Sequence, residues 1–360
     1  MEILVDRIEN PESWNSELED FRGSVFMTRE WLDAVSSAER TPIYLRFVKG
    51  REVLAVLGGL EILNVKKTAK QLFFYSGITA KEQDPEVIRK SKMALYEFAK
   101  SNNYYRVSMR SYDHTSYVPA TLKQFKVKQR TEFITFLDKD KDEIFDKFDA
   151  DIKRRARKAR RDGVVFKSGN SRFLAEKLFD LLDETNNIRR SKGYGKYSYF
   201  YLPFFEHKEI NKLIDTGYAS FYYAEFQDEI LGIQFVFNYQ GKAYEIFEGT
   251  SIKGYKLNAP AFLMCEVTGL LKEMGSYYYN HGGVPGSVKH QGLQKFKEKV
   301  GAQSIPSSEE VTNFITPPLN LLNPLLNLKR SLKKTNILPG KFRSAAIMII
   351  DAILNKRDKY

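Results

Sequence analysis

Cysteine and long apolar runs are scarce in this chain of 360 residues. The single cysteine, Cys265, has no second cysteine to pair with, which excludes an internal disulfide framework and favours a reducing compartment. No run of about 18 apolar residues is present, so a membrane-spanning helix is excluded. The opening residues, MEILVDRIENPES, lack the apolar segment of a secretory signal peptide. These absences favour a cytoplasmic protein, either soluble or bound at a membrane surface.

Several catalytic patterns are also missing. No Walker loop, HExxH, GxSxG or CxxC pattern occurs. His281 and His290 lie on either side of a glycine-rich turn, but no cysteine or carboxylate stands near them at a spacing typical of metal ligands. We therefore expect no metal site.

Acidic side chains are outnumbered by basic ones. The 45 Asp and Glu residues face 57 Lys and Arg residues, which gives a net charge of +12. This excess favours a polyanionic partner, such as a nucleic acid, an anionic membrane, or a phosphorylated substrate or coenzyme. Hydrophobic residues make up 42% of the chain, enough for packed cores, and the length is typical of two domains.

The basic residues gather in the segment from Asp142 to Gly163, DEIFDKFDADIKRRARKARRDG. Its apolar residues recur at helical spacing, at Ile144, Phe148, Ile152 and Ala159. No acidic residue lies between Lys153 and Arg161, which is unusual for a helix face that is only solvated. The pattern predicts one helix over 142–163 with a cationic face that is either solvated or binds phosphate. Its candidate tRNA- or phosphate-binding residues are Lys153, Arg154, Arg157, Lys158 and Arg161.

Two similar successions of elements indicate an internal duplication. The first is a hairpin over 43–62, a strand over 71–77, a helix over 85–100 and a strand over 104–110. The second is a hairpin over 219–239, a strand over 242–249, a helix over 260–274 and a strand over 276–283. The interval from Gly77 to Tyr105 equals that from Gly249 to Tyr277. Common α/β patterning is the alternative explanation.

Four motifs stand in a known order: KRRARKARRDGVVF, then FYYAEFQDEILGIQFVFNY with EIFEGTS, then LNAPAFLMCEVTGLLKEMG, and finally YYYNHGGV with GLQKFKEKVG. In this order they resemble the Fem-type aminoacyltransferases, which build the peptide cross-bridges of bacterial peptidoglycan. The resemblance covers roughly residues 24–305. It implies an α/β (α+β) fold of two tandem GNAT-like acyltransferase domains, with mixed sheets flanked by helices. The expected parts are residues 1–140, residues 141–305 led by the basic helix, and a basic, apolar tail over 306–360.

The sequence departs from this family in three places. No heptad run is long enough for the coiled coil that many members insert. Asn280 and His281 stand where the family commonly has an Asp before its glycines. The pyrophosphate loop of acetyl-CoA-dependent GNAT enzymes would fall at Gly254–Ala259, which reads GYKLNA and offers no clean phosphate cradle. The resemblance therefore implies aminoacyl-tRNA as the acyl donor and no tightly bound cofactor, with an acyl-CoA as the alternative donor.

Aminoacyl transfer requires stabilisation of an oxyanion, which a cation near the ester can provide. The resemblance places a functional lysine at Lys297, with Lys295 and Lys299 as competitors and an ordinary exposed helix lysine as the alternative. His281 is a second catalytic candidate, as a proton carrier.

Substrate contacts are predicted in both domains. Tyr255 and Lys256 are expected to line the cleft at the start of the helix over 260–274, unless they only form a capping loop. In the first domain, Lys49, Arg51 and Tyr75 are candidates for contact with a diphosphate-linked acceptor.

The sequence as a whole favours transfer of an amino acid from aminoacyl-tRNA to an amine of a lipid-linked or peptide cell-wall precursor. One rival is an acyl-CoA-dependent N-acyltransferase acting on an amino sugar or peptide. Another is a non-catalytic nucleic-acid-binding protein, which would leave the duplication and GLQKFKEKVG unexplained. Two apolar clusters flanked by Lys and Arg over 318–360 suit peripheral contact with the inner face of a membrane, or packing on the core, or a dimer contact. A monomer and a homodimer both remain open.

Overall fold

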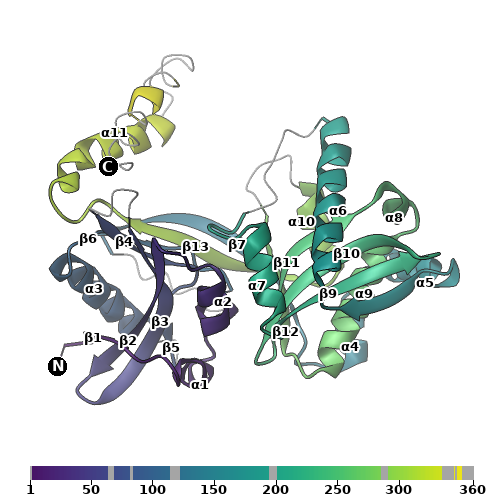
Figure 1. The fold of residues 1–360 in the computed structure, drawn as a ribbon, viewed down its shortest axis with the longest axis horizontal. Helices are drawn as coiled ribbons and strands as arrows, with labels where there is room; N and C mark the ends of the chain where they lie inside the picture. Colours follow the sequence, from purple (N-terminus) through teal and green to yellow (C-terminus); the bar gives the residue numbers. More distant parts are fainter. Residues whose placement is uncertain are drawn as a thin grey trace. The chain divides into compact units, whose positions relative to one another are not determined.

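The computed structural model describes residues 2–63, 69–81, 84–113, 122–193, 201–284, 291–334, 344 and 347–350 (Figure 1). Its contacts divide the chain into unit 1, Met1–Gln129 with Ser308–Tyr360, and unit 2, Arg130–Ser307. The division differs from the boundary expected at residue 140. It also assigns the C-terminal tail to unit 1, because strand β13 (Gln303–Thr312) pairs with strand β6 (Tyr104–Met109) of that unit.

Unit 1 is a mixed sheet with helix α3 (Pro85–Ser101) against one face (Figure 1). Its strands run in the order β1 (Leu4–Arg7), β2 (Arg40–Lys49), β3 (Glu52–Leu63), β4 (Lys70–Phe74), β6 and β13, with β5 (Thr79–Ala80) beside β3. Among the strand pairs of unit 1 that the structure describes, only β4 with β6 is parallel, as the crossover through α3 requires. Three short helices precede β2: α1 (Trp14–Asp20), η1 (Val25–Met27) and α2 (Arg29–Ala34). Asp84 caps α3, and Ile88, Leu95 and Ala99 bury its apolar side in the core.

Unit 2 repeats this arrangement. Its strands run in the order β7 (Phe125–Phe136, from Arg130 onward), β12 (Tyr278–Gly283), β11 (Lys242–Thr250), β10 (Glu229–Tyr239), β9 (Ala219–Phe226) and β8 (Val165–Gly169). The parallel pair is β11 and β12, joined through α8 (Ile252–Lys256) and α9 (Ala259–Glu273). One face is covered by α6 (Arg172–Ser191), where a Cβ on Gly249 would meet Leu181. The other is covered by α9, where a Cβ on Gly232 would meet Leu263. Both units are mixed sheets flanked by helices, which confirms the expected α/β (α+β) class.

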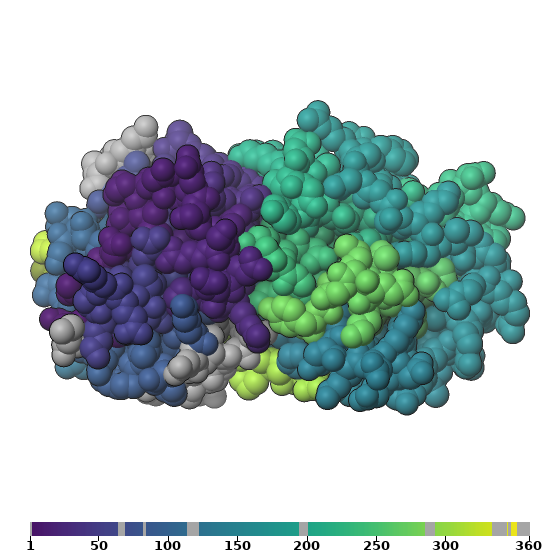
Figure 2. Space-filling model, turned by 90° about the horizontal axis from the view of Figure 1, so that it is seen from below, coloured from purple at the N-terminus to yellow at the C-terminus, as the bar shows by residue number. Residues whose placement is uncertain are grey.

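The prediction of one helix over 142–163 is wrong. The segment forms α4 (Lys141–Asp146) and α5 (Ala150–Arg161). Between them Phe148 forms a β-bridge with Val300, and the Asp149 amide donates to the Lys299 carbonyl at 2.8 Å. Asp149 then caps α5 by accepting from the Asp151 amide. The apolar periodicity continues across this break because both helices pack on one core, so it did not reveal the interruption. The surfaces of α4 and α5 lie beside that of α9 on the face of unit 2 that Figure 2 shows.

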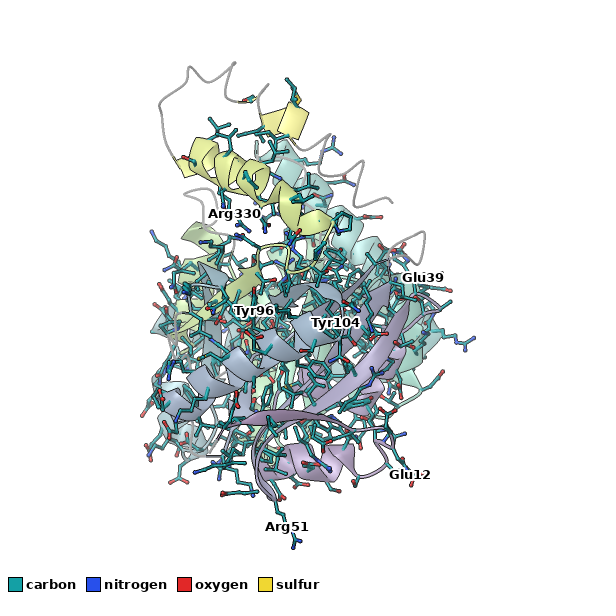
Figure 3. All side chains as sticks on the ribbon, turned by 90° about the vertical axis from the view of Figure 1, so that its left-hand side faces the viewer. Glu12, Glu39, Arg51, Tyr96, Tyr104 and Arg330 are labelled. Atoms are coloured by element: carbon teal, nitrogen blue, oxygen red, sulfur yellow. The ribbon has the colours of Figure 1, made fainter. Side chains whose placement is uncertain are left out.

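The C-terminal tail has an inner and an outer side. Leu322 of η3 (Leu319–Leu322) and Leu326 of helix α11 (Asn323–Lys334) pack with Tyr105 and Phe314. Large apolar side chains remain exposed on the outside: Leu321 (75%), Leu328 (50%), Met348 (67%) and Ile349 (63%). Figure 3 shows Arg330 on α11. Its guanidinium donates to Asn313 Oδ1. Within the described residues, no helix has both the length and the apolar character needed to cross a membrane.

Candidate functional site

The sheet of unit 2 opens between β11 and β12. The two parallel strands pair over three residues of each strand, ending at Tyr244 opposite Asn280. Beyond this point β11 continues along β10 to Thr250, whereas β12 continues along β7 to Gly283. We call the polar residues around this separation the divergence site: Gln234, Glu245, Glu248, Tyr279 and His281.

A β-bulge turns two carboxyl groups of β11 onto one face of the sheet. The register with β10 shifts at Ile246, which is an extra residue in β11. Glu245 and Glu248 are three positions apart and would face opposite sides of a regular strand. Because of the bulge, both lie on the face of Gln234, which is the α9 side of the sheet.

Hydrogen bonds connect the two carboxyl groups. The Gln234 amide nitrogen lies 3.5 Å from Glu248 Oε2. The Tyr279 hydroxyl lies 3.3 Å from Gln234 Oε1 and 3.1 Å from Glu245 Oε2, so its single proton serves one acceptor at a time. Burial is the main cause that raises the pKa of Tyr279, and Glu245 and Glu248 add to it, which keeps this hydroxyl a proton donor.

His281 belongs to the same network but is enclosed. Only 3% of the residue is exposed. Its Nδ1 lies 3.4 Å from Glu245 Oε2 and its Nε2 lies 2.9 Å from Thr135 Oγ1. Burial lowers the pKa of His281, against the opposing effect of Glu245, so the imidazole is neutral at pH 7. Its two ring nitrogens thus face Glu245 and Thr135 rather than an open space.

A third carboxylate, Glu132 on β7, occupies the opposite face of the sheet. It is 1% exposed and accepts from the Tyr244 hydroxyl at 3.2 Å and from the Asn280 amide at 3.0 Å. Asn280 Oδ1 accepts in turn from the Gly282 amide at 2.8 Å. An Asp at position 280 would set a second carboxylate against Glu132. The asparagine avoids that repulsion and explains this departure from the family pattern.

Lys297 belongs to helix α10 (Gln291–Lys299) and is 6% exposed. Its side chain reaches the end of β12. Its ammonium donates to the carbonyls of His281, Gly282 (3.2 Å) and Gly283 (3.0 Å). These bonds use all three of its N–H groups. Burial lowers the pKa of Lys297 to about 8, although the carboxylates of Glu245, Glu132 and Glu248 oppose this shift.

The two competing lysines lie elsewhere on α10. Lys295 is exposed, and Lys299 is exposed and pairs with Asp149 at 3.5 Å. Of these three lysines, Lys297 therefore reaches the divergence site. There its ammonium group is hydrogen-bonded to backbone carbonyls of β12.

Glu248 is held at one oxygen only. Its Oε2 faces Gln234, whereas its Oε1 has no hydrogen-bond partner among the described residues. Part of its surface meets solvent, yet the surrounding protein removes enough water to raise the pKa of Glu248 to about 8, and the nearby charge of Glu245 adds to the shift. A carboxyl group that is neutral at pH 7 therefore stands at the edge of the cluster.

The three residues predicted in unit 1 do not form a comparable site. Lys49 and Arg51 are exposed at the turn between β2 and β3, and Arg51 projects from it in Figure 3. Tyr75 is fully buried, with its ring edge-on to Trp31 and Phe73 at centroid distances of 5.4 and 5.0 Å. It follows β4, which pairs with the end of β3 remote from that turn.

The strands of unit 1 that correspond to β11 and β12 stay together. After the last paired residues of β4 and β6, the Arg110 amide still donates to the Phe74 carbonyl at 2.9 Å. The Tyr112 amide then donates to the Tyr75 carbonyl at 2.7 Å. Among the described residues, the separation of the parallel pair is therefore a feature of unit 2.

Tyr255 and Lys256 are exposed on α8, immediately after β11. Two backbone amides at the start of α8, one at the first residue of the expected pyrophosphate loop and one two residues before it, already have partners. The Gly254 amide donates to Ser251 Oγ at 2.9 Å, and the Ile252 amide donates to a carboxylate oxygen of Glu184 at 2.7 Å. A carboxylate at this turn would repel a diphosphate.

The cationic surface lies on α5. Ile152, Ala156 and Ala159 are buried, and four of the five predicted residues, Arg154, Arg157, Lys158 and Arg161, are exposed; Lys153 is half-buried. Arg154 pairs with Asp151, and Arg160 pairs with Glu266. Among the described residues, Arg157, Lys158 and Arg161 have no ion-pair partner. These three side chains are available to an external anion.

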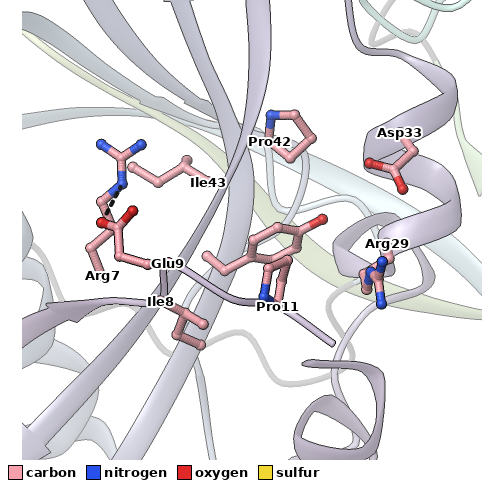
Figure 4. A pocket seen from close by; sticks show the side chains of 9 residues that line it. Arg7, Ile8, Glu9, Pro11, Arg29, Asp33, Pro42 and Ile43 are labelled. Carbon is pink, nitrogen blue, oxygen red and sulfur yellow. Dashed lines mark ion pairs between the residues drawn. The ribbon is translucent and has the colours of Figure 1, made fainter. Parts of the chain in front are cut away.

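A separate hollow of about 260 Å³ lies on unit 1 (Figure 4). Its charged lining contains Arg7 and Arg29 together with Glu9 and Asp33, so the two signs balance. None of the residues predicted from the sequence lines it.

Among the described residues there is no group of three or more His, Cys, Asp or Glu side chains arranged to hold a metal ion.

Sequence reasoning missed most of the divergence site, namely Gln234, Glu245, Glu248 and Tyr279. The available signal was the pair of glutamates in EIFEG, because charged residues are uncommon in an otherwise aromatic central strand. Their positions in the sequence would have placed them on opposite faces, and only the bulge brings them together.

Comparisons with solved structures identify the fold. FemX shares 15% sequence identity, with a TM-score of 0.68 over 90% of this chain and 99% of the FemX chain. L-PGS from Bacillus licheniformis shares 16% identity, with a TM-score of 0.49 over 91% of this chain and 97% of that one. No family model and no curated protein matches the sequence. The likeness to FemX confirms the predicted Fem-like tandem GNAT fold.

Proposed function

We propose that this protein is an acyltransferase that joins an acyl group to an amine at the divergence site of unit 2. The observation that carries the proposal is the separation of β11 from β12 beside two half-buried carboxyl groups, those of Glu245 and Glu248. Burying ionisable groups costs free energy, and proteins keep such groups chiefly where their chemistry is used. A protein that only binds nucleic acid through α5 would have no use for them.

The proposed donor is aminoacyl-tRNA. The Fem-like fold and the motif resemblance support it, and so does the unpaired cationic group formed by Arg157, Lys158 and Arg161. The carboxylate of Glu184 at the first amide of α8 argues against an acyl-CoA, whose diphosphate would need that turn.

The proposed acceptor is an amine of a cell-wall precursor, either lipid-linked or peptide. The outer side of the tail supports a lipid-linked acceptor, since the exposed Leu321 and Leu328 stand among basic residues in a segment with few acids. Peripheral contact with the inner face of the membrane and a cytoplasmic location follow from this proposal.

Mass spectrometry of reaction products tests both assignments. The full-length protein is incubated with charged tRNAs or with acetyl-CoA, and with peptide amines, amino sugars and lipid-linked precursors added separately. A product heavier than its acceptor by one aminoacyl residue supports the proposal. An acetylated product supports the acyl-CoA alternative. Binding of tRNA without any product, across all donors and acceptors, supports the nucleic-acid-binding alternative.

A further inference from the structure

We propose that the hollow on unit 1 binds a free α-amino acid, with the ligand carboxylate on Arg29 and Tyr44 and the ligand ammonium group on Asp33. All the residues that line the hollow belong to unit 1, and none belongs to the divergence site. The inference therefore goes beyond the proposed acyl transfer and can be tested separately from it.

The lining of the hollow includes a tyrosine whose hydroxyl has no hydrogen-bond partner among the described residues. Only 5% of Tyr44 is exposed, and its ring packs on Trp14 at a centroid distance of 5.0 Å. Burial raises the pKa of Tyr44, and Asp33 adds to the rise whereas Arg29 opposes it, so the hydroxyl stays protonated and lies near both charges. A buried hydroxyl is costly to leave unpaired, which indicates that a ligand accepts its proton.

Arg29 supplies a positive charge that the protein does not neutralise. The residue is half-buried, and its guanidinium makes one marginal hydrogen bond, of 3.5 Å, to the Glu12 carbonyl. Among the described residues it has no ion pair. Arg7, also in the lining, differs because it pairs with Glu9 at 3.7 Å (Figure 4) and with Glu61 at 3.7 Å. The unpaired guanidinium and the tyrosine hydroxyl are thus two donors that suit a carboxylate.

A negative charge beside these donors distinguishes the hollow from a simple anion site. Asp33 lies one helical turn after Arg29 on α2, and Figure 4 marks no ion pair between the two. Residues four apart on a helix have Cβ atoms about 5–6 Å apart, so both side chains can contact one small molecule. Asp33 repels an isolated anion, and Arg29 repels an isolated cation. An α-amino acid, whose ammonium and carboxylate groups share one carbon atom, satisfies both side chains.

The size and the rigidity of the hollow suit such a ligand. Its volume of about 260 Å³ lies below the roughly 300–1,000 Å³ of sites for drug-sized molecules. Ile8, Pro11, Pro42 and Ile43 supply apolar lining for a side chain of the ligand. The backbone is fixed around the tyrosine, because the Ile8 amide donates to the Tyr44 carbonyl at 3.0 Å and β2 pairs with both β1 and β3. Binding therefore needs little ordering of the protein.

Isothermal titration calorimetry of the full-length protein with each of the standard amino acids tests the inference. We expect saturable binding of at least one of them, with a Kd below about 10 mM. The carboxylic acid and the amine that correspond to this amino acid each carry only one of its two charges; for alanine they are propionate and ethylamine. Both should bind about tenfold more weakly or worse, because each loses one charge-assisted contact.

Three substitutions test whether the amino acid binds in this hollow. Tyr44→Phe removes the hydroxyl and keeps the ring that packs on Trp14, and Arg29→Gln removes the positive charge. Each should raise the Kd by about tenfold or more. Asp33→Asn should weaken binding of the amino acid but strengthen binding of the corresponding carboxylic acid, since it removes the repelling charge. Misfolding cannot produce that reversal. Glu19→Gln, at an exposed residue of α1 outside the hollow, is the matched control.

The opposite results would overturn the inference. If no amino acid binds with a Kd below about 10 mM, the hollow is not an amino-acid site. Equal affinities for an amino acid and its carboxylic acid would make it a simple anion site. Unchanged Kd values for Tyr44→Phe and Arg29→Gln would place the bound amino acid elsewhere. A wild type that binds the amino acid but transfers no acyl group would remove the proposed function and leave this inference standing.

Discussion

At the scale of single residues, Lys297 lies at the candidate site that the sequence suggested, but its ammonium group is bound to the protein backbone. A lysine that only faced the substrate could be replaced by methionine with little effect on stability. The structure instead satisfies three backbone carbonyls of β12 with this one ammonium group. A substitution that removes the charge of Lys297 therefore also removes hydrogen bonds that hold β12.

We predict that Lys297→Met destabilises unit 2 as well as lowering turnover. Leaving buried acceptors without a donor costs about 1–3 kcal/mol, and each kcal/mol lowers Tm by about 2–4 °C in a domain of this size. Lys295→Met, an exposed position on the same helix, is the control and should leave Tm unchanged. Differential scanning calorimetry gives both values. An unchanged Tm for Lys297→Met would show that these carbonyls do not depend on the lysine.

A second residue-scale prediction concerns pH. The pKa of Glu248 rises from 4.5 to about 8 on folding, so between these values the folded chain holds a proton that the unfolded chain has released. This contribution to stability is fully present below about pH 4.5 and is lost as the pH rises to about 8. We expect Glu248→Gln to lack this loss, so that its Tm falls less than that of the wild type between pH 5 and 8.

Melting curves at pH 5, 6, 7 and 8 measure the difference, with Glu225→Gln as the control. The comparison stops at pH 8 because the lowered pKa of Lys297 contributes in the opposite direction above it. Parallel pH dependences for wild type and Glu248→Gln would contradict a raised pKa at this residue.

At the scale of elements, α5 separates its apolar and cationic faces, with buried Ile152, Ala156 and Ala159 opposite the charged side chains. Three of its arginines already have acidic partners: Arg154 and Arg155 pair with Asp151, and Arg160 pairs with Glu266. Reversing any of them would break an ion pair as well as change the surface charge. A test of anion binding therefore belongs on Arg157, Lys158 and Arg161.

We predict that changing these three residues to Glu weakens tRNA binding at least tenfold without altering Tm. Wild-type affinity should fall steeply with salt because each phosphate contact releases counterions, and the variant should show a shallower slope. The matched control reverses three exposed lysines of unit 1, Lys90, Lys100 and Lys123. Filter binding across several salt concentrations provides the data. Equal loss in the control would mean that net charge alone, not α5, determines the affinity.

At the scale of the whole molecule, the sequence of the tail left open whether it contacts a membrane, packs on the core or forms a dimer contact. Leu322, Leu326 and Ile350 pack on unit 1, so the inner side belongs to the core. Removing the chain from about Ser308 would also remove the pairing of β13 with β6 and the buried pair of Lys92 with Glu310. Truncation is thus a poor test of membrane contact, and substitutions on the outer side are needed.

We predict that the wild type co-sediments with anionic vesicles and not with neutral ones. Leu321→Glu combined with Leu328→Glu should reduce the bound fraction several-fold, since it replaces exposed apolar contact with two repelled charges. Met93→Glu, at an exposed apolar residue of α3, is the matched control. Undiminished binding by the double variant would remove the outer side of the tail as the membrane contact.

The sequence by itself determined the succession of elements in both units. Period-two and period-3.6 patterns, with their turn residues, are local properties, which is why the hairpins and the helix over 85–100 agree with the structure. The order of the motifs was enough to indicate the tandem fold that FemX shares. The resemblance also placed a functional lysine at Lys297, and His281 was a separate candidate as a proton carrier; the structure brings the two residues together.

Tertiary structure alone decided which groups meet. The bulge at Ile246 depends on how β11 pairs with β10, and it brings Glu245 and Glu248 to one face against their spacing in the sequence. The bridge between Phe148 and Val300 joins residues remote in the chain and divides the predicted helix. Burial, which shifts the pKa values of Glu248 and Lys297, likewise depends on neighbours from several strands. Contacts between distant segments set these properties, and no local pattern encodes them.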